Sequence, residues 1–275
     1  MGAASSEAGG KLRQPMRPRR TLEGENMGGQ GRPLYPARGP ERHFDGIALR
    51  SQLKNSADSA FSVCAGKRAV ALGFILSKQG VFMKYISQLD YPHVPYPTDT
   101  DHPAKIRESE ETIETSGCGI CSLCMVVDQL TTEELSLQEC IQMSFDIRAN
   151  HAVGTDMKIL GPVVAERYAL RYSATDDVRS MICAVRNGGR AIANVGGDRE
   201  GHAGVFSHVG HYIAVIGAKE NEVCILDPSL ENGKFESPER RGKVRMDGFF
   251  VYCSPEVLDK DASNRVPRYH IFERR

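Results

Sequence analysis

The hydrophobic pattern of the chain changes near residue 189. Between residues 118 and 187, apolar side chains recur at three- and four-residue steps, the spacing of helices. After it, apolar and β-branched residues gather in short runs separated by glycine or polar turns, at 190–195, 211–218, 222–227, 248–253 and 268–273. Helices first and strands afterwards predict an α+β fold, with an N-terminal helical layer packed on a C-terminal antiparallel sheet.

The helical half divides into separate predicted helices. They cover residues 119–130, 136–148, 155–168 and 176–187. The first is expected to be amphipathic. Ser136 and Glu139 have the spacing of a capping box, and Pro162 interrupts the third helix. Ahead of these, residues 59–77 are typical of a helix or a helix plus a strand, and 81–86 of a short strand.

The first 44 residues differ in composition from the rest. They are rich in Gly, Pro and Arg, carry more basic than acidic side chains and show no apolar period. Such a segment cannot bury enough apolar surface to order itself, so we expect a disordered basic tail. Residues 45–275 have ordinary globular composition and predict one domain.

Charge and hydropathy narrow the partners and the location. The 275 residues carry 35 basic and 35 acidic side chains, so no overall basic field favours nucleic acid. No apolar run reaches the roughly 18 residues of a membrane span, and the first thirty residues lack the apolar core of a secretory signal. We therefore expect a soluble, cytoplasmic protein with neither nucleic-acid nor membrane partners, although a misplaced start could hide a signal. The sequence gives no oligomeric state.

Cys118 is the strongest chemical candidate. It lies between two glycines directly before a predicted helix, where the helix dipole and free N–H groups favour a thiolate. A nucleophilic thiol also needs a base, and the base needs a group that orients it. His211 begins one predicted strand and Asp227 ends the next, so antiparallel pairing of the two strands would place them side by side.

A metal site is the competing interpretation of the same cysteines. Cys118, Cys121 and Cys124 are spaced as in iron–sulfur proteins, and Cys140 could be a fourth ligand. The Cys-Pro that completes the ferredoxin pattern is missing. In a single helix Cys121 and Cys124 would lie about 300° and about 240° around from Cys118, so the thiolates would not converge.

Four segments together resemble a known family. In order they are SGCGICSLCMVV, RAIANVGG, GHYIAVIG and ILDPS. They resemble the papain-like cysteine peptidases of the bacteriocin-processing, double-glycine leader type, over residues 84–230. The resemblance implies a papain-like fold with Cys118 as nucleophile, His211 as general base, Asp227 as the orienting residue and Gln88, in ISQLDYP, as an oxyanion donor. It implies a peptide or protein substrate and no metal or organic cofactor.

The sequence departs from the family pattern beside the proposed nucleophile. Ile120 replaces a usual proline, and Cys121 and Cys124 replace small residues. Gln88 lies further from the cysteine than in papain, and Gln79 is a weaker rival. Three alternatives stay open: an inactive papain-like binding module, an acyl-transferase or amidase with the same triad, and a cysteine-rich metal protein. His202 and His208, in a glycine-rich loop, are expected to be exposed or to face substrate.

Overall fold

The computed structural model of the chain describes residues 83–98 and 109–275. The predictions for the tail at 1–44, for the helix at 59–77 and for Gln79 concern residues outside these ranges. Within them, residues 83–86 form no strand, in contrast to the prediction. A short 3-10 helix, η1 (Gln88–Asp90), follows.

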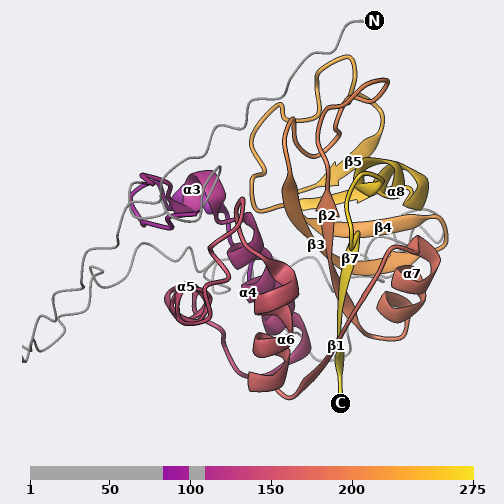
Figure 1. The fold of residues 1–275 in the computed structure, drawn as a ribbon. Helices are drawn as coiled ribbons and strands as arrows, with labels where there is room; N and C mark the ends of the chain where they lie inside the picture. Colours follow the sequence, from indigo (N-terminus) through magenta and orange to yellow (C-terminus); the bar gives the residue numbers. More distant parts are fainter. Residues whose placement is uncertain (1–82, 99–108) are drawn as a thin grey trace, which may run out of the picture. The chain divides into compact units, whose positions relative to one another are not determined.

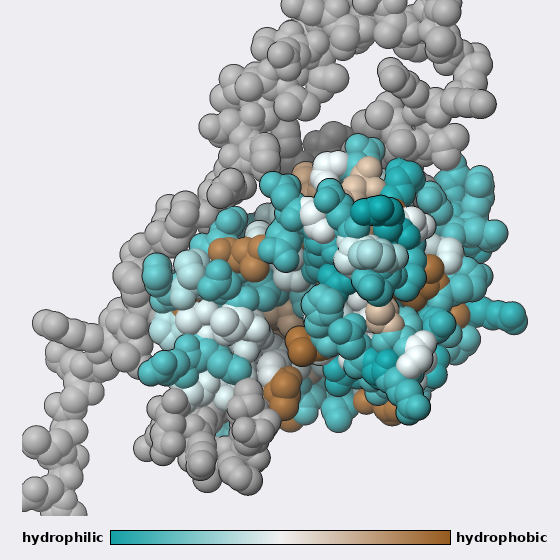
Figure 2. Space-filling view, turned by 90° about the horizontal axis from the view of Figure 1, so that it is seen from above, coloured by the Kyte–Doolittle hydropathy of each residue, from teal (hydrophilic) through white to brown (hydrophobic). Residues whose placement is uncertain are grey.

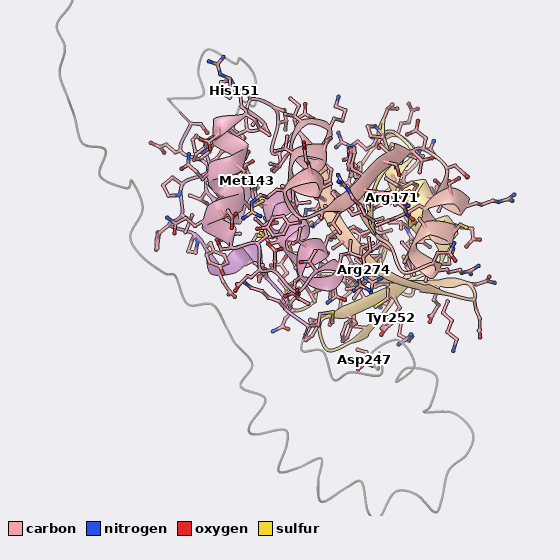
Figure 3. All side chains as sticks on the ribbon, turned by 90° about the horizontal axis from the view of Figure 1, so that it is seen from below. Met143, His151, Arg171, Asp247, Tyr252 and Arg274 are labelled. Atoms are coloured by element: carbon pink, nitrogen blue, oxygen red, sulfur yellow. The ribbon has the colours of Figure 1, made fainter. Side chains whose placement is uncertain are left out.

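Seven strands form one antiparallel sheet within the described residues, in the order β1-β7-β2-β3-β4-β6-β5 (Figure 1). Their bounds are β1 Leu170–Thr175, β2 Arg190–Val195, β3 His211–Lys219, β4 Glu222–Leu226, β5 Val244–Asp247, β6 Phe250–Cys253 and β7 Tyr269–Arg274. Figure 3 marks this order from below, with Arg171 on β1, Arg274 on β7, Tyr252 on β6 and Asp247 on β5.

The helices are α3 Ile113–Ser116, α4 Cys118–Leu130, α5 Leu137–Asp146, α6 Met157–Arg167, α7 Val178–Arg186 and α8 Pro255–Ala262. Four of them match the predicted helices closely. Ser136 caps α5 as expected, its hydroxyl accepting from the Glu139 N–H at 3.1 Å. None of the described helices is long and apolar enough to cross a membrane.

Helices cover both faces of the sheet. On one face α4 packs on β2 and β3 and α6 packs on β1 and β7, while α7 and α8 pack on the strands from the other side (Figure 1). The strand residues alternate accordingly: Ile192 and Ala214 join the core under α4, and Ala191 and Ile213 join the core under α7 and α8. The prediction of a single helical layer on the sheet was therefore incomplete.

Two elements depart from the predicted order of helices first and strands afterwards. Strand β1 lies between α6 and α7, so strands and helices are not fully segregated along the chain. It is a mostly exposed edge strand, LRYSAT, with little apolar alternation, and it is held by pairing with β7 over six residue pairs. Helix α8 interrupts the strand region; Ser254 caps it, and Pro255 occupies its first turn.

The helix α4 is more deeply buried than an amphipathic helix. All residues from Gly119 to Val127 are buried, with the sheet on one side and α3 and α5 on the other. The apolar period predicted the helix correctly, but the residues between the apolar positions are buried as well, because they are small (Cys121, Ser122) or apolar (Met125, Val126). The nucleophile candidate thus begins a helix that is buried between the sheet and the helices α3 and α5.

Candidate active site

Cys118 is the first residue of α4, and the glycines beside it make room for that position. Gly117 ends α3 and precedes α4; a Cβ there would lie 2.6 Å from the carbonyl oxygen of Ile113. A Cβ on Gly119 would lie 2.8 Å from Cβ of Thr155 and 3.2 Å from Cδ2 of Tyr212. Gly119 therefore admits neighbouring side chains of the protein, which bring the start of α4 against β3.

The β3–β4 hairpin places His211 beside Asp227. Ala214 pairs with Leu226, and the two-residue turn contains Glu220 at a φ of 52°. His211 is the first residue of β3, and Asp227 directly follows β4. His211 Nε2 lies 2.8 Å from Asp227 Oδ1, with 5% of the His211 side chain and none of the Asp227 side chain exposed.

Cys118 is the third member of this group. The thiol is within hydrogen-bonding contact of the His211 side chain and is itself partly exposed. The structure thus brings together three of the predicted residues, Cys118, His211 and Asp227, from α4, β3 and the end of β4.

The electrostatics of this group favour a thiolate and an imidazolium. Burial acts to raise the pKa of the Cys118 thiol, but the hydrogen bond and charge of His211 and the backbone of Tyr212 and Gly119 outweigh it, so the pKa is lowered. Burial likewise acts to lower the pKa of His211, yet Asp227 and Cys118 raise it to about 9. Asp227 is also buried, and contact with His211 and Lys234 holds its carboxyl pKa far below the usual value.

Further residues hold Asp227 in place. The Ser229 N–H donates to Asp227 Oδ1 at 3.0 Å, and the Tyr85 hydroxyl donates to the Asp227 carbonyl at 2.7 Å. The Lys234 ammonium lies 2.7 Å from Asp227 Oδ2. The Ser229 hydroxyl is also 3.0 Å from His211 Nε2.

Sequence reasoning missed Tyr85, Ser229 and Lys234. Ser229 carried a usable signal, because Asp-x-Ser after a strand is typical of an Asx turn. Lys234 had none: it lies in a loop without any period, and only the folded chain shows that its ammonium turns back to Asp227.

Gln88 contacts both the segment after β4, at Pro228, and the helix α3, at Glu114. Its backbone N–H donates to the Pro228 carbonyl at 2.8 Å, and its side-chain Nε2 donates to the Glu114 carbonyl, in α3, at 2.5 Å. The side chain is buried, and its Oε1 has no hydrogen-bond partner among the described residues. One N–H of the amide is therefore occupied by α3, and the other is left for a further acceptor.

The remaining cysteines of the motif are packed in the core. Cys121, Cys124 and Cys140 are at most 1% exposed, and burial raises the pKa of Cys121 and of Cys140. Among the described residues, no three His, Cys, Asp or Glu side chains are arranged to hold a metal ion. Cys118 differs from its neighbours in being partly exposed and in contacting a histidine.

The two loop histidines separate in the structure. The His208 side chain is 74% exposed and 2.8 Å from Asp198. The His202 side chain is only 7% exposed, and its Nε2 lies 2.7 Å from Oδ1 of the fully buried Asp261, in α8. The prediction that His202 is exposed or faces substrate was wrong, because its acidic partner lies 59 positions further along the chain.

Comparison with known proteins gives two structural likenesses. No family model and no curated protein sequence matches the chain. The peptidase domain of Streptococcus ComA, a bifunctional ABC transporter involved in quorum sensing, is 15% identical, with a TM-score of 0.39, over 58% of this chain and 93% of its own length. A C39-like peptidase from Bacillus anthracis is 12% identical, with a TM-score of 0.41, over 58% of this chain and 90% of its own. With both TM-scores below 0.5, we argue function from the site residues of this chain itself.

Proposed function

We propose that the chain is a cysteine peptidase that cleaves peptide or protein substrates through an acyl-enzyme on Cys118. The observation that supports this most directly is the contact series from the Cys118 thiol to the His211 imidazole and from His211 Nε2 to Asp227 Oδ1 at 2.8 Å. A thiolate at a helix start, a histidine with a raised pKa and a buried carboxylate are the three parts that nucleophilic catalysis requires.

The reaction follows from these roles. The Cys118 thiolate attacks the substrate carbonyl carbon, and the carbonyl π electrons move to the oxygen. His211 donates its proton to the leaving amine as the carbon–nitrogen bond breaks. His211 then takes a proton from water, which attacks the thioester carbon and releases the acid and the Cys118 thiolate.

The oxyanion has two candidate donors. The first-turn N–H groups of α4 have no carbonyl partner within the helix, as at any helix start. The second N–H of the Gln88 amide is the other donor, since its first N–H donates to Glu114. Asp227 keeps the imidazole oriented and stabilises its charged form.

A peptide could reach this group along the surface. Figure 2 looks down on the molecule from above in the view of Figure 1 and shows a hollow between its helical side and its sheet side, with apolar surface in it. Val153 and Val209 are among the exposed large apolar residues, at 76% and 71%. Val209 lies two residues before His211, and Val153 adjoins Gly154, which packs near the Ser116 carbonyl.

The test is cleavage of a peptide library in water enriched in 18O, with the products read by mass spectrometry. We expect new carboxyl ends that carry one 18O, and no cleavage by the Cys118→Ala variant. Acid quenching early in the reaction should leave an acyl adduct on the peptide that contains Cys118. Cleavage by Cys118→Ala at the wild-type rate contradicts the proposal. Equal inactivity of both proteins favours the binding-module alternative, and transfer of the acyl group to added amines favours a transferase.

A further inference from the structure

The Lys234 ammonium is bound on all sides beside Asp227. Its Nζ donates to Asp227 Oδ2 at 2.7 Å, to the Ser229 hydroxyl at 2.6 Å and to the Ser229 carbonyl at 3.1 Å. An ammonium has three N–H donors, so each of them has a partner. The Lys234 side chain is 5% exposed, and burial of a lysine is rare unless it is paired.

The loop after β4 is built to hold this lysine in place. Phe235, its neighbour, is buried and meets Phe206 edge-on with ring centroids 6.0 Å apart. The buried Arg240 donates to the Lys234 carbonyl at 3.1 Å and to the Gly204 carbonyl at 2.9 Å. The loop that carries Lys234 is thereby joined to the loop that leads into His211.

We propose that Lys234 is a positioning residue of the proposed active site, which fixes the Asp227 carboxylate and supplies the positive charge that balances it. This inference rests on the proposed function of Cys118. With the Cys118 thiolate and the His211 imidazolium, Asp227 and Lys234 make a set of four charges that sums to zero. Without Lys234 the same buried site would carry a net negative charge, which opposes formation of a thiolate.

Other titratable groups surround this set. The Tyr85 hydroxyl donates a hydrogen bond to the Asp227 carbonyl, and Asp90 is near Tyr85. Cys121 is close to Cys118 on α4, and the Arg265 guanidinium packs against Gly210, beside His211. Burial raises the pKa of Tyr85 and of Cys121, so both stay neutral in the range of the experiment. Arg265 is present in every variant and does not alter the comparison.

The experiment measures how fast iodoacetamide alkylates Cys118 as a function of pH, by peptide mapping of the full chain. Wild type is compared with Lys234→Met, which removes the charge, and Lys234→Arg, which keeps it. Lys260→Met removes an exposed lysine on α8 and is the control. We expect the alkylation midpoint of Lys234→Met to move upward by about one pH unit. The midpoints of Lys234→Arg and Lys260→Met should stay near that of wild type.

A merely structural lysine predicts a different result. Lys234→Met would then lower the melting temperature and leave the midpoint of Cys118 where it is in wild type. That outcome overturns the inference while the proposed function stands. If wild-type Cys118 shows no alkylation below the ordinary thiol range, the proposed function fails, and the role of Lys234 fails with it.

A second pair of variants covers the case in which Lys234→Met does not fold. Asp227→Asn keeps the lysine charge and removes the carboxylate, whereas Asp227→Asn combined with Lys234→Met removes both and leaves no unpaired buried charge. We expect the midpoint of the double variant to lie above that of Asp227→Asn. Equal midpoints in these two proteins contradict a charge role for Lys234.

Discussion

The part of the chain that the structure describes contains two buried histidine–aspartate pairs with nearly equal nitrogen–oxygen distances. His211 Nε2 is 2.8 Å from Asp227, and His202 Nε2 is 2.7 Å from Asp261. The Asp261 carboxylate also accepts the N–H groups of Val205 and Phe206, so that pair fixes a loop on α8. His211 instead has a further side-chain partner, the Cys118 thiol. A buried His–Asp pair is therefore not a sign of catalysis by itself, and the Cys118 thiol beside His211 distinguishes the two.

The largest expected effect separates the pairs by activity. His211→Ala removes the proposed base and should lower the peptidase kcat/KM of the folded protein by at least about 10³-fold. His202→Ala removes the hydrogen bond between His202 Nε2 and the buried Asp261 carboxylate and should lower the free energy of unfolding by about 2 kcal/mol. The folded fraction of His202→Ala should keep near wild-type kcat/KM. Loss of activity to the same degree in both variants would contradict a catalytic role for His211 and a structural role for His202.

Substitution of the two carboxylates should likewise affect activity at Asp227 and stability at Asp261. Asp227→Asn keeps the shape of the side chain but favours the wrong imidazole tautomer, so we expect kcat to fall by roughly 10²- to 10⁴-fold. Asp261→Asn can still accept one backbone N–H and should affect thermal unfolding more than kcat. Steady-state kinetics and melting curves of the two variants, measured side by side, check this contrast.

The pH dependence of stability sharpens the comparison further. The pKa of His211 is raised from 6.5 to about 9 on folding. The stability contributed by its charged form is thus fully present below about pH 6.5 and is lost as the pH rises through about 9. Wild type should show this loss in melting temperature between those values, whereas His211→Ala should not. Parallel curves for the two proteins would contradict a raised pKa at His211.

The smallest effect is expected in the core of α4. Cys124→Ala removes a buried sulfur next to Cys140 and should cost about 1 kcal/mol of stability. The alkylation of Cys118 and the metal content of the purified protein should not change. A bound metal that is lost in this variant would restore the metal interpretation of the cysteine motif.

Parts of this site could be predicted from sequence because they depend on local pattern. Glycines and an apolar period placed Cys118 at a helix start, and two short strands with a tight turn placed His211 near Asp227. Other parts depend on contacts that no local pattern encodes. The Lys234 ammonium reaches Asp227 from a loop, and Asp261, the partner of His202, lies on α8. Strand β1 has little apolar alternation, and its place at the sheet edge depends on pairing with β7 and on packing against α6.

The role of Gly119 shows the same limit. Glycines on both sides of Cys118 are typical of a sharp turn that a substrate backbone can approach closely. The structure instead fills the space at Gly119 with Thr155 and Tyr212, one from the segment before α6 and one from β3. The residue type was informative, but the neighbour that required it was set by tertiary packing.

The most direct test of the central claim is the alkylation rate of each cysteine by iodoacetamide across pH, in wild type, His211→Ala and His202→Ala. The account predicts that Cys118 alone reacts rapidly near pH 6, that His211→Ala loses this low-pH reaction and that His202→Ala keeps it. Reaction of Cys118 only above the free-thiol pKa of about 8.5, or no faster than Cys121 and Cys124, would contradict the assignment of Cys118 as a base-paired nucleophile.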